Sequence, residues 1–213
     1  MLGSPGQAFE CSHDHGHGDR CLSFRFEPAY FERFVADSGL RGARPEFRRM
    51  RVPPVRALSP LVARACAGMA GATNVTWDEM ALALAARTLE VDGGLPPASS
   101  DAPPPSTVAR VTRVVRAIER EPLAELTLDS MAREARLSPY HFLRTFERLT
   151  GLTPHQYVLR ARLRAVATRL AIEPRRRVLD LALDAGFGDV SNFNRAFKAE
   201  FGESPRALRQ RVG

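Results

Sequence analysis

The chain has 213 residues, of which 44% are hydrophobic, and its formal net charge is +7 at pH 7. This length suggests one or two domains, and no apolar run approaches the ~20 residues of a membrane span, so a membrane partner is not expected. Residues 106–213 hold 20 Lys and Arg against 12 Asp and Glu, whereas residues 1–105 hold 11 against 12. The excess positive charge is confined to the C-terminal half, which favours a polyanion-binding module over a merely solvated surface.

The N-terminal stretch CSHDHGHGDRC groups five possible metal ligands within eleven residues. They are Cys11, His13, His15, His17 and Cys21. Zinc or another transition metal accepts such ligands. However, Gly16 and Gly18 favour a loop, no standard zinc-finger spacing is present, and a polar turn with packed cysteines is the alternative. The chain has three cysteines, which do not suggest a disulfide framework and are typical of a reducing cytoplasm.

The pattern after this stretch predicts one strand and three helices. Residues 21–26 alternate apolar and polar side chains, which indicates a strand. Helices are expected over residues 28–38 and 60–70, and a third helix is expected to begin after Thr76 as N-cap and to end at Gly93. The last two helices could pack within the chain or against a second copy in a homodimer.

Residues 92–106 are rich in proline, glycine and serine and predict a linker. The expected organisation is therefore a mixed α/β segment at residues 1–91 and an all-helical domain at residues 107–213. In this second part apolar periodicity predicts helices at residues 108–118, 128–135, 139–149, 154–173, 178–185 and 190–200, and a short one from Pro205.

The same apolar skeleton occurs twice in the second part. At an offset of 50 residues the pairs are Leu128 with Val178, Met131 with Leu181, Ala132 with Ala182, Ala135 with Ala185, and Leu137 with Phe187. At an offset of 51 they are Ser138 with Asp189, Phe142 with Phe193, Arg144 with Arg195, Phe146 with Phe197, Gly151 with Gly202, and Pro154 with Pro205. Each copy predicts a helix, a short turn and a second helix with Ser138 or Asp189 as N-cap.

This arrangement is typical of a helix-turn-helix unit, whose second helix enters the major groove of DNA. Two ordinary helical hairpins would also produce a repeat, but the positive charge lies on the same half. The helix expected at residues 154–173 would be about 30 Å long, close to the ~34 Å between successive major-groove faces. One chain could then present two reading helices one turn of DNA apart.

Residues 107–210 resemble the DNA-binding domain of AraC/XylS transcription regulators. The resemblance is carried by LSPYHFLRTFERLTGLTPHQYVLRARL and VLDLALDAGFGDVSNFNRAFKAEFGESPRALR. It implies seven helices, two helix-turn-helix units joined by a linking helix, double-stranded DNA as ligand, and activation of transcription beside RNA polymerase. The N-terminal HDHGHGDRCLSFRF resembles the late edge of a jelly-roll sensor of this family, either reduced or continued upstream of Met1.

Outward positions of the two reading helices are the expected base readers. They are Tyr140, Leu143 and Arg144 in the first unit and Val190, Ser191, Asn192, Asn194 and Arg195 in the second. Arginine suits guanine and asparagine suits adenine, whereas Leu143 and Val190 offer only apolar contact, such as with a thymine methyl. An arginine in both repeats could instead pair with Asp129 or Asp184.

Phosphate contacts are expected from polar and basic residues around the two units. They are Ser138, Arg148, His155, Gln156, Arg175, Arg176, Arg177 and Lys198. Four arginines of the linking helix are expected to be partly solvated surface: Arg160, Arg162, Arg164 and Arg169.

The sequence therefore predicts a cytoplasmic, nucleoid-associated DNA-binding regulator and not an enzyme. A non-specific architectural DNA binder is one alternative. A metal-dependent enzyme built on the Cys/His stretch is another, although Asp14 and Asp19 are the nearest general bases and both resemble turn residues. The operator, the inducer and the oligomeric state do not follow from the sequence.

Overall fold

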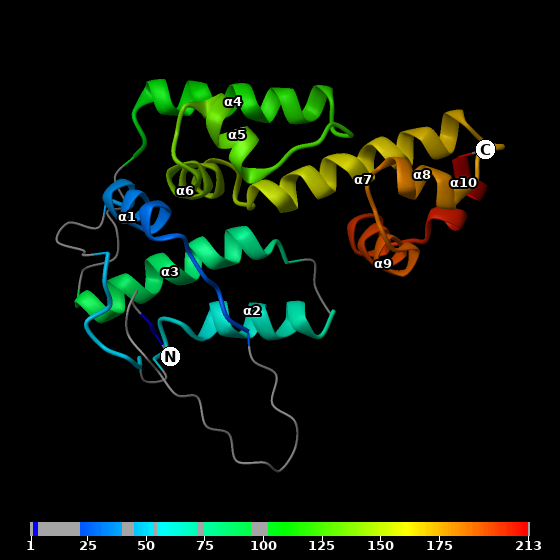
Figure 1. The fold of residues 1–213 in the computed structure, drawn as a ribbon. Helices are drawn as coiled ribbons and strands as arrows, with labels where there is room; N and C mark the ends of the chain where they lie inside the picture. The colour runs from blue at the N-terminus through cyan, green and yellow to red at the C-terminus, as the bar shows by residue number, and fades with distance from the viewer. Residues whose placement is uncertain are drawn as a thin grey trace, which may run out of the picture. The chain divides into compact units, whose positions relative to one another are not determined.

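The computed structural model describes residues 2–3, 22–39, 45–52, 55–71, 75–94 and 102–212. The described residues form ten helices and no strand (Figure 1). The chain divides into two compact units, Met1–Ala102 and Pro103–Gly213. None of the described helices is both long enough and apolar enough to span a membrane.

The first unit contains three helices. They are α1 (Pro28–Asp37), α2 (Ser59–Met69) and α3 (Trp77–Gly93). Helix α3 packs on α2, and its apolar residues from Met80 to Leu89 are largely buried. Helix α1 buries Phe31 and Phe34, whose ring centroids lie 5.7 Å apart. The three predicted helices are thus confirmed, each to within one or two residues.

The strand predicted at residues 21–26 is wrong over the part that the structure describes. Residues 22–27 belong to no sheet and lead directly into α1. Their aromatic side chains meet helices: the ring centroid of Phe24 lies 6.3 Å from that of Trp77, and that of Phe26 lies 5.4 Å from that of Phe31. Phe24 and Phe26 are thus half-buried against helical aromatic residues, whereas Leu22 on the same predicted face is exposed. The jelly-roll edge is not supported. The metal-ligand stretch at residues 11–21 lies outside the described residues.

The ends of the predicted linker are helical. Asp92 and Gly93 belong to α3, which ends at Gly94 in the left-handed conformation with φ +60°. A glycine there avoids the steric cost that a Cβ would bring. At the other end, Pro105 and Ser106 begin the next helix. Thr76 occupies the N-cap position of α3 as predicted, but its Oγ1 is buried without a hydrogen-bond partner, so it does not cap the helix.

The second unit contains seven helices over its described residues, as predicted. They are α4 (Pro105–Arg120), α5 (Leu128–Ala135), α6 (Pro139–Thr150), α7 (Pro154–Ile172), α8 (Val178–Asp184), α9 (Val190–Phe201) and α10 (Pro205–Val212). Helix α7 is the longest and runs from the group α4–α6 to the group α8–α10 (Figure 1). It packs on α4 and α6 at one end and on α8, α9 and α10 at the other. Its first turn is closed by a capping box between Thr153 and Gln156.

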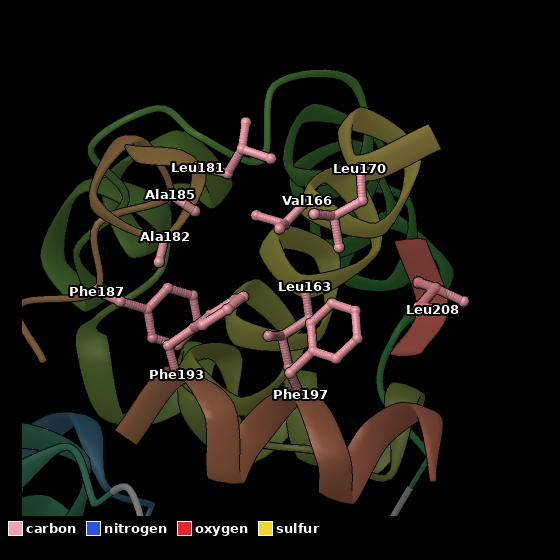
Figure 2. Packing of buried hydrophobic residues seen from close by; sticks show 10 residues of the cluster. All are labelled: Leu163, Val166, Leu170, Leu181, Ala182, Ala185, Phe187, Phe193, Phe197 and Leu208. Atoms are coloured by element: carbon pink, nitrogen blue, oxygen red, sulfur yellow. The ribbon is translucent and has the colours of Figure 1, made fainter. Parts of the chain in front are cut away.

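The core of the second half of this unit is built from four helices and one turn. It contains Leu163, Val166 and Leu170 of α7, Leu181 and Ala182 of α8, Ala185 and Phe187 of the turn, Phe193 and Phe197 of α9, and Leu208 of α10. Figure 2 shows Phe193 and Phe197 pointing from α9 toward α7, with Phe187 beside Phe193. Phe193 and Phe197 lie on one side of α9 and anchor the helix to this core, so the opposite side of α9 remains at the surface.

Candidate nucleic-acid interface

The two helix-turn-helix units have the same turn geometry. In the first, the Leu137 N–H donates to the Ala132 carbonyl at 3.0 Å; in the second, the Phe187 N–H donates to the Ala182 carbonyl at 3.1 Å. The residue before each donor is left-handed, with φ +53° at Arg136 and +78° at Gly186. The sequence repeat is therefore a repeat of backbone hydrogen bonds as well as of apolar residues.

The reading helices are also anchored alike. The rings of Phe142 and Phe146 in α6 are 5.4 Å apart at 53°, and those of Phe193 and Phe197 in α9 are 5.5 Å apart at 54°. All four side chains have no exposed surface. The two helices have the same length, and each is anchored by an equivalent pair of phenylalanine rings. The N-terminal turn of each helix is therefore held in the same way relative to its own helix-turn-helix unit.

Both N-caps form as predicted. The Ser138 Oγ accepts from the His141 N–H at 3.4 Å. The Asp189 carboxylate accepts from the N–H groups of Ser191 and Asn192, both at 3.0 Å. A carboxylate at this position satisfies free N–H groups and complements the positive end of the helix dipole. It also means that an approaching phosphate would meet Asp189 at the start of α9, so the N-terminus of α6 is the better phosphate site of the two.

The second reading helix exposes most of its predicted base readers. Ser191, Asn194 and Arg195 are exposed, and Val190 and Asn192 are half-buried. They lie on the sides of α9 left open by Phe193 and Phe197. The alternative partner for Arg195, Asp184, is contacted by Arg169 at 3.0 Å and by Arg176 at 2.8 Å. The surface of α9 thus offers hydrogen-bonding groups suited to adenine and guanine.

The first reading helix differs from the prediction at two positions. Tyr140 and Leu143 were expected to be exposed, but their exposed fractions are 6% and 2%. The Arg144 guanidinium lies 5.7 Å from the centroid of the Tyr140 ring and covers one face of it, an attractive cation–π arrangement. Leu143 has no polar side-chain atom to keep in water, so burial is favourable. Arg144 itself remains half-exposed.

Five of the predicted phosphate ligands are exposed: Arg148, Arg175, Arg176, Arg177 and Lys198. Two predicted ligands contribute to the fold: the Gln156 Oε1 accepts from the Thr153 N–H at 3.1 Å, and Arg176 pairs with Glu173 and Asp184. Arg176 therefore helps to hold α8 against the end of α7, and its side chain would have to leave that network to contact DNA.

The four arginines expected to be surface on α7 all make contacts. Arg160 pairs with Glu200 at 3.2 Å, Arg164 with Glu119 at 2.7 Å, and Arg169 with Glu173 at 2.7 Å. Hydrogen bonds from Arg169 lower the pKa of Glu173 below its ordinary value. The fourth, Arg162, donates to two backbone carbonyls. No local sequence signal identifies these partners, since most lie far along the chain.

His155 should make the compact unit Pro103–Gly213 less stable in mild acid. Burial, and then the positive charge of Arg162, lower the pKa of His155 below its ordinary value of 6.5. The unfolded chain therefore binds a proton at a pH where folded His155 resists it. The free energy of unfolding should fall as pH drops through 6.5, and the loss should end below the folded-state pKa.

Urea titrations between pH 5 and pH 8 would measure this slope in the wild type and in His155→Gln, which should flatten it. His141→Gln is the matched control because this histidine is exposed. An unchanged slope in His155→Gln would assign the acid sensitivity to other groups, such as carboxylates in the ion pairs of α7.

A family model described as a helix-turn-helix domain matches residues 131–211. Residues 131–211 form an AraC-type helix-turn-helix domain. This confirms the resemblance inferred from the repeated motif. The matched segment is about two fifths of the chain and runs from α5 to α10.

Known proteins are similar to about half of the chain. The bifunctional transcriptional activator/DNA repair enzyme AdaA of Bacillus subtilis is 31% identical over 100 residues, which are 47% of this chain and 47% of AdaA. The HTH-type transcriptional activator RhaS of Klebsiella pneumoniae is 34% identical over 102 residues, which are 48% of this chain and 36% of RhaS. The chain thus covers less than half of either relative.

Among solved structures, the C-terminal domain of AraT, a response regulator from Geobacillus stearothermophilus, matches with a TM-score of 0.43 and 24% identity. The match covers 51% of this chain and 86% of that one.

Proposed function

We propose that this protein is a sequence-specific double-stranded DNA-binding transcription regulator and that it acts as an activator. The observation that carries the proposal is the duplicated reading helix: α6 and α9 are anchored by equal phenylalanine pairs, and each leaves polar or basic side chains on its open side. The net positive charge of residues 106–213 supports a polyanionic ligand. The names of AdaA and RhaS, both transcriptional activators, support the direction of regulation.

The two reading helices would lie in successive major grooves on one side of the duplex. Helix α7 has 19 residues, so it is about 28 Å long. This is close to the ~34 Å between successive major grooves on one face of B-DNA. Arg144, Asn192, Asn194 and Arg195 would read base edges, with Val190 and Ser191 beside them, while Arg148, Arg175, Arg177 and Lys198 would hold phosphates.

Residues 1–91 would form a regulatory segment, and residues around 92–106 would join it to the DNA-binding domain. RNA polymerase is the expected partner of an activator, and a homodimer would form through the helices of Met1–Ala102. A protein whose ligand is chromosomal DNA would act in the cytoplasm at the nucleoid.

Selection from random duplexes with the full 213-residue chain, at physiological salt, tests the proposal. Two short enriched blocks about one helical turn apart would support a two-headed reader. The preference over random DNA should be at least ~10³-fold. Salt-sensitive binding without any enrichment would favour the architectural binder instead.

A parallel selection with added zinc tests the Cys/His stretch, because zinc-dependent enrichment would make it a sensor.

The salt dependence of binding to the selected site is a second prediction. About six phosphate contacts should give a slope of log Kobs against log salt concentration near −5. Fluorescence anisotropy between 50 and 300 mM salt would measure it. A slope near zero would contradict phosphate contacts as the main source of affinity.

A further inference from the structure

Arg162 joins α7 to the segment that precedes the first helix-turn-helix unit. Its Nε donates to the Pro122 carbonyl at 3.1 Å, and its Nη2 donates to the Ala124 carbonyl at 3.0 Å. Both acceptors lie between α4 and α5. The Nε and Nη2 hydrogens point from the same edge of the planar guanidinium, so one edge holds two backbone carbonyls of this segment in a fixed geometry.

The rest of the same guanidinium lies against the second helix-turn-helix unit. A Cβ added to Gly186, in the turn between α8 and α9, would lie 2.9 Å from the Arg162 Nη1. Side-chain carbons do not approach other heavy atoms so closely, so the glycine leaves room for the arginine. One side chain thus contacts the backbone before α5 and the backbone before α9.

The guanidinium is well suited to a fixed position between the two units. It is half-buried, and burial lowers the pKa of Arg162, although an arginine stays charged at neutral pH. Its hydrogen bonds are charge-assisted and made to backbone, so they do not depend on another side chain. By contrast, Arg160 and Arg164 each pair with one acid and are about half exposed, at 50% and 45% of their side-chain surface. Exposed ion pairs of this kind contribute little rigidity.

We propose that Arg162 is a positioning residue that fixes the separation and relative orientation of α6 and α9. It thereby sets the number of base pairs that a DNA site must have between its two recognised blocks. The inference rests on the proposed function. Helix α7 packs against each half separately, so without Arg162 the halves can tilt about α7 while each unit keeps its own core and its own base preference.

The test measures spacing, not affinity alone. Duplexes carry the two selected blocks with the selected spacer or with spacers one, two or three base pairs longer or shorter, and the full chain is titrated against each by anisotropy. One base pair moves a block by ~3.4 Å and about a tenth of a turn, so the wild type should lose about tenfold or more in affinity per step. Arg162→Met should lose at most about threefold, with the base preference within each block unchanged.

Arg164→Met is the matched control, because it removes one positive charge and one ion pair from the same helix two residues away. It should keep the spacing preference of the wild type. Gly186→Ala approaches the same contact from the other side: the added methyl displaces the guanidinium while the charge stays. It should broaden the spacing preference as Arg162→Met does, and it is the second variant if Arg162→Met fails to fold. Because φ at Gly186 is +78°, alanine there also strains the turn, so its free energy of unfolding is measured by urea denaturation alongside, and its base preference within each block must stay that of the wild type.

Wild-type spacing preference in both Arg162→Met and Gly186→Ala would overturn the inference and leave the proposed function intact. Equal broadening in Arg164→Met would also overturn it, since loss of charge would then be the cause. A wild-type chain that enriches no blocks at all would instead reject the proposed function, and this inference with it.

Discussion

Replacement of Phe193 by alanine should lower the free energy of unfolding of the compact unit Pro103–Gly213 by ~3–5 kcal/mol. Phe193 has no exposed surface, and its ring centroid lies 5.1 Å from that of Phe187 and 5.5 Å from that of Phe197. Its loss leaves a cavity between α9, the turn and α7. Because these rings are the anchor of α9, the variant should also lose sequence-specific DNA binding even where it still folds. Urea denaturation followed by circular dichroism gives the first quantity, and anisotropy with the selected duplex gives the second.

Asn194→Ala is the stability control for this change. Asn194 is adjacent in sequence but exposed, so its replacement should alter the free energy of unfolding by no more than about 0.5 kcal/mol. Phe142→Ala should cost about as much as Phe193→Ala, because Phe142 is also fully buried and has an equivalent ring partner in Phe146. If Phe193→Ala lowers the free energy of unfolding by less than ~1 kcal/mol, the core formed by α7–α10 can close around the missing ring.

The features that the sequence predicts well are those that form locally. The helix at Leu128–Ala135 and both N-caps agree with the prediction, because a cap is decided by residues three positions apart. The repeat is equally visible, since each copy needs the same small alanine and the same aromatic pair to close its turn. The seven helices of Pro103–Gly213 can therefore be predicted from apolar periodicity, N-cap residues and the internal sequence repeat.

The features that it misses depend on residues distant in the chain. The alternation at residues 21–26 gave one apolar face, but whether a strand forms depends on a neighbouring strand, and the structure places helical aromatic residues against it instead. Burial of Leu143 could not be inferred from α6 alone, because helical periodicity assigns it to the open side. Local pattern gives the side of a helix on which a residue lies, not what covers that side.

Arg162 is the clearest example among the polar residues. Its acceptors are 40 and 38 residues earlier in the chain, so the local sequence of α7 does not distinguish it from the three other arginines of that helix. The one local signal lies in the two turns. The first helix-turn-helix unit has Arg136 at the left-handed position, whereas the second helix-turn-helix unit has Gly186 there. At Gly186 the guanidinium of Arg162 occupies the space that a Cβ would need, and the left-handed φ of +78° favours glycine as well.

Replacement of Arg195 by alanine should relax the base preference at one or two positions of the site and cost ~1–3 kcal/mol of binding free energy there. Arg195 is exposed on α9, six residues after the N-cap Asp189. An arginine in this place has the reach and the donor geometry for the O6 and N7 atoms of guanine. Competition binding with duplexes altered at each position of the selected site would locate the effect.

Lys198→Ala separates base reading from phosphate contact. Lys198 is exposed one turn further along α9, and its loss should weaken binding to all duplexes alike and reduce the magnitude of the salt slope by about one. The two variants each remove one positive charge from the same helix, so a general electrostatic effect would make them indistinguishable. If Arg195→Ala also weakens binding to all sequences equally, Arg195 contacts a phosphate or stabilises the fold. The specificity of the second helix-turn-helix unit would then come from the other outward residues of α9, namely Val190, Ser191, Asn192 and Asn194.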